Sequence, residues 1–147
     1  MNQKILIING PNLEMLGKRK KNIYGSFTLQ DLENTILKNA SELNCEVVFF
    51  QSNVEGEIIN KINSLDDTFT GMIVNPGGLT HSSVSLHDSL EIKTFPKIEV
   101  HLSNIYSREE FRRKSLISPA CTCSIMGMGI QGYIYALNYI IENTQES

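Results

Sequence analysis

Two side chains in this sequence are suited to proton transfer. His101 ends the apolar segment "PKIEVH", and residues two apart in a strand share a face, which would place Glu99 beside it. A carboxylate next to an imidazole orients the ring and stabilises its charged form, so His101 is a candidate general acid. The alternative is a histidine that closes a strand and bonds a backbone carbonyl.

Tyr24 is the second candidate, and it lies near the end of the basic segment "LGKRKKNIYG", residues 16–25. This segment is longer than most connections between a strand and a helix, and we expect it to form a lid. A guanidinium beside the phenol would stabilise the phenolate, which makes Tyr24 a candidate base. The alternatives are that residues 18–21 are only solvated charge and that Tyr24 packs as an aromatic plug.

Two further segments could bind a ligand. "NPGGLTHSS", residues 75–83, offers hydroxyls and backbone N–H groups to a carboxylate or a phosphate, and its His81 could contact a ligand, cap a helix or lie on the surface. In "SREEFRRKS", Arg108 and Arg112 are four residues apart and would share a helical face. They could bind substrate oxygens, pair with acidic neighbours or stay solvated, and the last is the default.

The segments that must position these residues alternate between two patterns. Short Val- and Ile-rich runs without clean alternation are typical of strands buried on both faces, and they occupy residues 4–9, 45–50, 71–75, 96–101 and 121–128. Helices are predicted over residues 28–43, 55–65, 82–90, 107–115 and 130–143. This order predicts an α/β fold of the flavodoxin-like, doubly wound kind: a five-stranded parallel sheet, order 2-1-3-4-5, with helices on both faces.

Local signals support two of the helix starts. Thr28 with Asp31, and Ser107 with Glu110, have the spacing of capping boxes.

The predicted sheet indicates where a ligand would bind. Ligands of such sheets bind outside the carboxyl ends of the strands. The polar residues expected there are Asn9, Asn12, Asn75, His81, His101, Ser103 and Asn104. For any single Asn or Ser, a helix cap is the better interpretation.

Composition limits the function classes. A length of 147 residues and a formal charge of -3 predict one domain, residues 1–147, that is not a general nucleic-acid binder. No segment has the length of a membrane span, and "MNQKILIING" lacks the features of a signal peptide. Three cysteines in or beside apolar runs indicate reduced, buried thiols in a cytoplasmic protein, although Cys121 and Cys123 would share a strand face.

A metal site is not expected from these residues. His81, His87 and His101 have spacings that match no compact ligand motif, and no cysteine or carboxylate completes one.

Several separate segments, taken together, resemble the type II 3-dehydroquinate dehydratases. They are "INGPNLEMLGKRKKNIYG", "FQSNVEGEIINKI", "NPGGLTHSSVSLHDSL", "IEVHLSNIYSREEFRRKSLISP" and "GMGIQGYIYAL". The resemblance runs nearly end to end, and the motifs occur in order at suitable spacing. It is therefore far more specific than any single Gly-rich turn.

The resemblance implies dehydration of 3-dehydroquinate to 3-dehydroshikimate through an enolate, in the shikimate pathway or in quinate breakdown. It implies no cofactor, no metal and no Schiff-base lysine. Within the matching motifs, Tyr24 is the base and Arg19 assists it, while Asn12 holds a water that stabilises the enolate oxygen. His101 protonates the departing hydroxyl, with Glu99 behind it.

The resemblance also implies a binding set and an assembly. Asn75, His81 and Arg112 would surround the substrate hydroxyls, and Leu102 and Ser103 would bind the carboxylate. The family forms homo-oligomers, dodecamers built from trimers. Asp88 matches the family's aspartate that reaches a neighbouring subunit's site.

Some positions depart from the family's common pattern, and none of them is assigned to proton transfer. They are Lys20 and Lys21 in place of a frequent Glu-Pro, Val54, Asn60, His87 and Tyr106. The two lysines make the lid more cationic and, without proline, less restrained. We expect the departures to affect lid dynamics, affinity and subunit contacts rather than the reaction.

Two other classes of function remain as alternatives. A module that binds a nucleotide or a phosphate would use the lid cations and the Gly-rich turn, although the first loop lacks a short Gly/Ser/Thr-rich cradle and the chain has no P-loop. A structural or regulatory oligomer that has lost its chemistry would not need Arg19, Tyr24, Asn75, Glu99 and His101 together.

Overall fold

The five predicted strands form one parallel sheet in the computed structural model, which describes residues 3–144. The strands are β1 (Lys4–Asn9), β2 (Glu46–Gln51), β3 (Gly71–Asn75), β4 (Lys97–His101) and β5 (Cys123–Met126). Their order is β2-β1-β3-β4-β5, and every neighbouring pair is parallel. The predicted sheet order is therefore confirmed.

The burial of the strands follows their place in the sheet. Every residue of β3 and β4 is buried, and so is β1 after its first residue, because helices cover both faces of these central strands. The edge strands β2 and β5 are only partly buried. The near-continuous apolar runs of the sequence thus mark the centre of the sheet.

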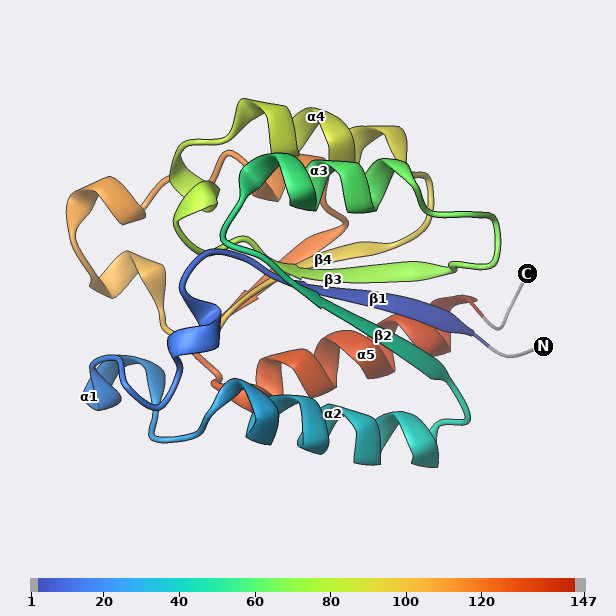
Figure 1. Cartoon of the computed structure of the whole chain (residues 1–147), viewed down its shortest axis with the longest axis horizontal. Helices are drawn as coiled ribbons and strands as arrows, with labels where there is room; N and C mark the ends of the chain where they lie inside the picture. The colour runs from blue at the N-terminus through green and yellow to red at the C-terminus, as the bar shows by residue number, and fades with distance from the viewer. Residues whose placement is uncertain (1–2, 145–147) are drawn as a thin grey trace.

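Four longer helices form the two outer layers (Figure 1). One face of the sheet carries α2 (Leu29–Glu42) and α5 (Ile130–Thr144), and the other carries α3 (Glu55–Asn63) and α4 (Val84–Ile92). Each face has its own apolar core. The predicted capping box of α2 is confirmed, since Thr28 Oγ1 accepts from Asp31 N at 3.1 Å and Asp31 Oδ2 accepts from Thr28 N at 3.0 Å.

The helix predicted over residues 107–115 is wrong. Two short 3-10 turns, Ile105–Ser107 and Glu110–Arg112, stand in its place, and Ser107 Oγ donates to Asn104 O instead of capping a helix. Residues 109–111 are exposed, including Phe111, so the segment has no apolar stripe to bury. Most helix stability in proteins comes from packing such a stripe, which explains why the helical spacing and the second capping box fail here.

The three cysteines are unpaired, but the prediction that they are buried is wrong, since Cys45 and Cys121 are half-buried and Cys123 is exposed. Cys121 follows the 3-10 turn Ser118–Ala120 and lies outside β5, so the prediction that it shares a strand face with Cys123 is wrong. Burial, reinforced by the charge of Glu99, raises the pKa of the Cys121 thiol to about 12. This thiol is therefore protonated and unreactive at neutral pH.

A helix can span a membrane only if it is both long and apolar. Between residues 3 and 144, none combines the length and the apolarity that a membrane-spanning helix needs.

Candidate active site

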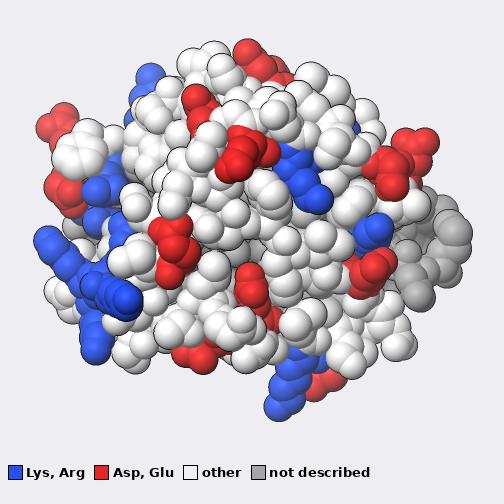
Figure 2. Space-filling model, viewed as in Figure 1, with Lys and Arg blue, Asp and Glu red and all other residues white. Residues whose placement is uncertain are grey.

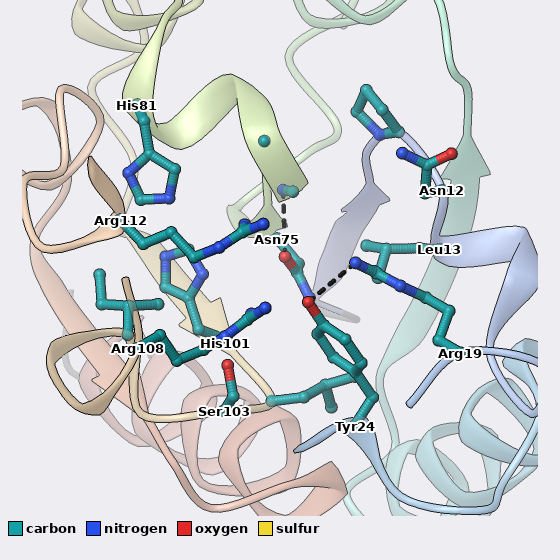
Figure 3. Close-up of a pocket in the computed structure, with 15 residues that line it drawn as sticks. Asn12, Leu13, Arg19, Tyr24, Asn75, His81, His101, Ser103, Arg108 and Arg112 are labelled. Atoms are coloured by element: carbon teal, nitrogen blue, oxygen red, sulfur yellow. Dashed lines mark hydrogen bonds between the residues drawn. The ribbon is translucent and has the colours of Figure 1, made fainter. Parts of the chain in front are cut away.

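A pocket of about 170 Å³ lies at the carboxyl ends of β1, β3 and β4, where the strand order reverses. Its walls come from residues 11–13, the lid, the turn after β3, and residues 101–112 (Figure 3). Most of the residues singled out in the sequence line it: Asn12, Arg19, Tyr24, Asn75, His81, His101, Leu102, Ser103 and Arg112. Glu99 lies behind His101, and Asp88 lies on α4, away from the pocket.

The basic segment of residues 16–25 places a guanidinium beside the phenol of its own Tyr24. Tyr24 ends the short helix α1 (Lys21–Tyr24), and Arg19 Nη2 donates to its Oη at 2.8 Å (Figure 3). The Arg19 Cζ also lies 3.8 Å from the centre of the Tyr24 ring. The arrangement therefore places one permanent positive charge beside both the hydroxyl and the ring of Tyr24.

Arg108 is a pocket residue for which the sequence favoured a solvated role. Its Cζ lies 4.9 Å from the centre of the Tyr24 ring, and its side chain is mostly buried. The four-residue spacing between Arg108 and Arg112 was the signal available in the sequence. It was interpreted as a shared face of a helix, and that helix does not form. Both arginines are instead brought to the pocket by 3-10 turns, with Glu109 Oε1 3.7 Å from Arg108 Nε and Glu109 Oε2 3.1 Å from Arg112 Nε.

Glu99 and His101 form a buried pair, as the strand period predicted. His101 Nε2 lies 2.6 Å from Glu99 Oε2, and Glu99 is fully buried. Two serines also donate to this carboxylate, Ser115 Oγ to Oε2 at 2.7 Å and Ser124 Oγ to Oε1 at 2.7 Å. With Nε2 engaged by Glu99, Nδ1 is the nitrogen of His101 that a substrate in the pocket can reach.

The pKa of Glu99 is lowered from its ordinary value near 4.5. Burial by itself would raise this pKa, but the hydrogen bond and charge of His101, together with the bonds from Ser115 and Ser124, outweigh burial. Glu99 is therefore a carboxylate at neutral pH. Its hydrogen bond to Nε2 holds the His101 ring in place.

This lowered pKa predicts a pH-dependent contribution of Glu99 to stability. The contribution is present above the ordinary pKa near 4.5 and is lost as the pH falls through the lower folded-state value. Urea unfolding should show Glu99→Gln to be less stable than wild type at neutral pH, with the gap narrowing as the pH falls below about 4. The matched control is Glu42→Gln, the same change on an exposed residue of α2. A gap that is constant across this range would contradict the assigned charge.

Asn75 is held by buried groups from two other elements. Its Nδ2 donates to Tyr133 Oη at 2.9 Å, and Tyr133 Oη donates to Asn9 Oδ1 at 2.7 Å. The Gly77 N–H donates to Asn75 Oδ1 at 3.2 Å. Burial raises the pKa of Tyr133 well above its ordinary value, so this hydroxyl stays neutral.

Two polar residues expected at this edge have other roles. Asn9 is buried and bonds Tyr133, and it is not among the residues that line the pocket. Asn104 accepts from Tyr106 N at 3.1 Å and caps the following 3-10 turn. The cap interpretation was therefore the better one for Asn104.

The mouth of the pocket is strongly basic. Eight of the thirteen Lys and Arg residues lie in residues 18–21 and 108–114, although the whole chain has a net charge of -3. Figure 2 shows this concentration as blue side chains gathered at the left of the view, where Figure 1 places α1 and the 3-10 turns. Opposite charges attract over about 8–10 Å at physiological salt, so the rim favours an anionic ligand.

Asn12 and His81 complete opposite sides of the rim (Figure 3). Asn12 has a left-handed backbone conformation, with φ 72°, and its N–H donates to Asn53 Oδ1 at 2.8 Å. His81 is held by a bond of 2.9 Å between its Nδ1 and Lys114 O. Backbone contacts thus fix both positions and leave the Asn12 amide and the second His81 nitrogen for a ligand.

One cluster of potential metal ligands occurs among residues 3–144, and it lies outside the pocket. His87, Asp88 and Glu91 on α4 bring ligand atoms within 4.8 Å of one another. His87 Nδ1 is 2.6 Å from Leu116 O, and its Nε2 is 3.4 Å from Glu91 Oε1. Hydrogen bonding along an exposed helix face accounts for this cluster without an ion.

Comparison with known proteins gives one consistent result. The family model "Dehydroquinase class II" matches residues 3–141. The "3-dehydroquinate dehydratase" of Caldicellulosiruptor saccharolyticus is 54% identical over 92% of this chain and 94% of its own length. That of Thermotoga neapolitana is 51% identical over 98% of each chain.

Solved structures agree with the sequence relatives. The type II dehydroquinase of Butyrivibrio crossotus has a TM-score of 0.92 at 45% identity, covering 95% of this chain and 97% of its own. The type II dehydroquinase of Propionibacterium acnes also has a TM-score of 0.92, at 37% identity, covering 97% of this chain and 98% of its own.

Proposed function

Because the chain belongs to the class II dehydroquinase family, we propose that it dehydrates 3-dehydroquinate to 3-dehydroshikimate through an enolate, as a hydro-lyase of the shikimate pathway. The observation that carries the mechanism is the pairing across one pocket of Tyr24, bonded by Arg19, and His101, bonded by Glu99. One pair supplies a base and the other an acid, which are the two groups that this elimination needs.

Tyr24 removes the proton next to the substrate ketone. The reacting form is the phenolate, and the Arg19 guanidinium 2.8 Å from the phenol oxygen stabilises it. The Arg108 guanidinium over the ring adds positive charge on the same side of the pocket. The C–H electron pair moves toward the ketone oxygen, and an enolate forms.

The enolate oxygen is stabilised by a water held at Asn12. The Asn12 backbone is fixed in the left-handed region by its bond to Asn53, and its amide lies at the pocket rim. A positioned hydrogen bond aimed at developing negative charge is among the strongest contributions to catalysis. The basic rim lowers the energy of the same charge.

His101 then protonates the departing hydroxyl, which leaves as water while the enolate electrons form the new carbon–carbon double bond. The proton comes from Nδ1, because Nε2 bonds Glu99 at 2.6 Å. The hydrogen bond to the Glu99 carboxylate holds the imidazole ring in this orientation. The sum of the two steps is the loss of one water, with no redox change.

The remaining pocket residues bind and orient the substrate. The carboxylate is bound by the backbone and side chain at Leu102 and Ser103, just beyond β4. The hydroxyls are bound by Asn75 at the end of β3, by His81 on the turn that follows it, and by Arg112 on the 3-10 turn Glu110–Arg112. Polar groups from several loops on one rigid sheet edge give the geometric precision that proton transfer requires.

The chain is a single catalytic domain, residues 1–147, that assembles as a dodecamer built from four trimers. Supporting this, Asp88 is exposed on α4 outside the pocket of its own subunit, where a neighbouring subunit could use it. Sedimentation velocity decides between a monomer, a trimer and a dodecamer. Three unpaired cysteines are consistent with a cytoplasmic, reducing environment.

The proposed reaction is tested by mixing the purified protein with 3-dehydroquinate and following ultraviolet absorbance. Dehydration creates a conjugated enone carboxylate, so absorbance should rise, and treatment with a chelator should not change the rate. Denatured protein is the control for spontaneous dehydration. Folded protein that gives no signal would contradict the reaction, and phosphate and nucleotide binding would then be measured, since the basic rim and the Gly-rich turn favour anions.

A further inference from the structure

Tyr133 is a buried residue that the proposed mechanism does not use. Its ring lies in the core between α5 and the sheet with zero exposure, among apolar residues that phenylalanine would fit equally well. Its hydroxyl is the feature that packing alone does not explain. Burying a hydroxyl lowers stability unless it is hydrogen-bonded, and this one joins Asn9 on β1 to Asn75 on β3.

The directions of these bonds are determined by chemistry. Asn9 Oδ1 can only accept, so the Tyr133 hydroxyl donates its hydrogen there, and its lone pairs then accept from Asn75 Nδ2. At the other end of the same amide, Asn75 Oδ1 accepts from Gly77 N–H. A flipped Asn75 amide would place N–H against N–H at Gly77 and would present its oxygen to Tyr133 Oη, whose hydrogen is already committed to Asn9.

This network has one orientation, and it leaves one donor for a ligand. Nδ2 of Asn75 carries two hydrogens, and only one of them bonds Tyr133. Asn75 lines the pocket between Tyr24 and His101, so the second N–H is the one that can meet a substrate oxygen (Figure 3). Asn9 Nδ2 is buried without a partner among the described residues, a cost that a purely stabilising network would avoid.

We propose that Tyr133 is a positioning residue for substrate binding, and that its hydroxyl fixes the Asn75 amide so that one N–H points at a substrate hydroxyl. This inference rests on the proposed function, in which Asn75 binds the substrate. It assigns to α5, which contributes none of the pocket-lining residues, a part in specificity for a hydroxylated ring. Tyr133 acts only through Asn75.

Removing the hydroxyl should weaken binding more than turnover. In Tyr133→Phe the amide loses one of its two fixed contacts, so KM should rise about fivefold to tenfold, the effect of one neutral hydrogen bond, while kcat changes less than about twofold. The affinity for 3-dehydroshikimate, measured by calorimetry, should fall by the same factor. The matched control is Tyr135→Phe, the same change two residues along α5 at an exposed tyrosine, which should leave KM unchanged.

A double-mutant cycle separates positioning from general destabilisation. If Tyr133 acts through Asn75, adding Tyr133→Phe to Asn75→Ala should change KM less than about twofold further, although it still lowers Tm. If Tyr133→Phe raised KM by the same factor in the wild type and in Asn75→Ala, the inference would be overturned. If Tyr133→Phe does not fold, Asn9→Ala gives the same test, because it frees the Tyr133 hydrogen. It should raise KM by a smaller factor, again only when Asn75 is present, and an unchanged KM would overturn the inference.

The outcomes distinguish this inference from the proposed function. If the wild-type protein does not dehydrate 3-dehydroquinate, the proposed function itself is overturned. An active enzyme whose Asn75→Ala variant has normal KM overturns the binding role of Asn75 and the positioning role with it. A raised KM in Asn75→Ala together with an unchanged KM in Tyr133→Phe overturns the positioning role alone.

Discussion

Tyr24→Phe should lower kcat by about a hundredfold to ten-thousandfold, the range expected for loss of a positioned general base. The change removes only the phenol oxygen that Arg19 contacts at 2.8 Å. The ring stays to pack against the guanidinium of Arg19, 3.8 Å away, and that of Arg108, 4.9 Å away. Fold and assembly should therefore be unchanged, and the loss should appear in the enone absorbance assay.

Exchange of the substrate proton with deuterated water tests the role of Tyr24 more directly. A base that removes the proton next to the ketone allows deuterium to enter the substrate, so Tyr24→Phe should abolish this exchange together with product formation. Tyr139→Phe, at an exposed position of α5, is the matched control and should behave as wild type. Wild-type exchange or turnover in Tyr24→Phe would remove Tyr24 from the mechanism.

His101→Gln is the second change with a large expected effect, again about a hundredfold to ten-thousandfold in kcat. Glutamine can still donate an N–H to Glu99, which His101 contacts at 2.6 Å, so the buried carboxylate keeps a partner. What is lost is the acidic proton that the departing hydroxyl needs. Because this proton acts after the enolate has formed, product formation should fall while deuterium exchange continues.

The contrast between these two variants is the sharpest test of the division of roles. His87→Gln is the matched control for His101→Gln, because His87 bonds Leu116 O and Glu91 outside the pocket. This control should leave both product formation and deuterium exchange unchanged. If His101→Gln loses exchange to the same extent as product formation, His101 acts before or during proton removal. The assignment of acid and base would then have to be revised.

Much of the scaffold follows from local sequence patterns. The apolar runs located the five strands, because strands buried on both faces must be apolar throughout, and the alternation of strands with helices indicated the sheet order. The period of two in a strand also placed Glu99 beside His101, since that contact depends only on strand geometry. The capping box of α2 is local in the same way, because Thr28 and Asp31 bond each other's backbone.

Patterns that depend on a packed partner were less reliable. The helix expected over residues 107–115 had suitable spacing and a capping signal, but residues 109–111 in its middle are exposed and two 3-10 turns form instead. Arg108 was therefore assigned a solvated role, whereas the turns direct it to the ring of Tyr24. Intrinsic helix propensity has only a weak influence on whether a short exposed segment forms a helix. Tertiary contacts have the larger influence on its conformation.

The sequence by itself determined the sheet, the edge at which the pocket lies, and, through resemblance to a family, the residues expected to act there. Only the tertiary structure decided which distant groups support them: Ser115 and Ser124 on the carboxylate of Glu99, and Tyr133, 58 positions from Asn75 and 124 from Asn9. The physical reason is that a period of two or 3.6 residues records which face a side chain occupies. It carries no information about which residue of another element meets that side chain in the core.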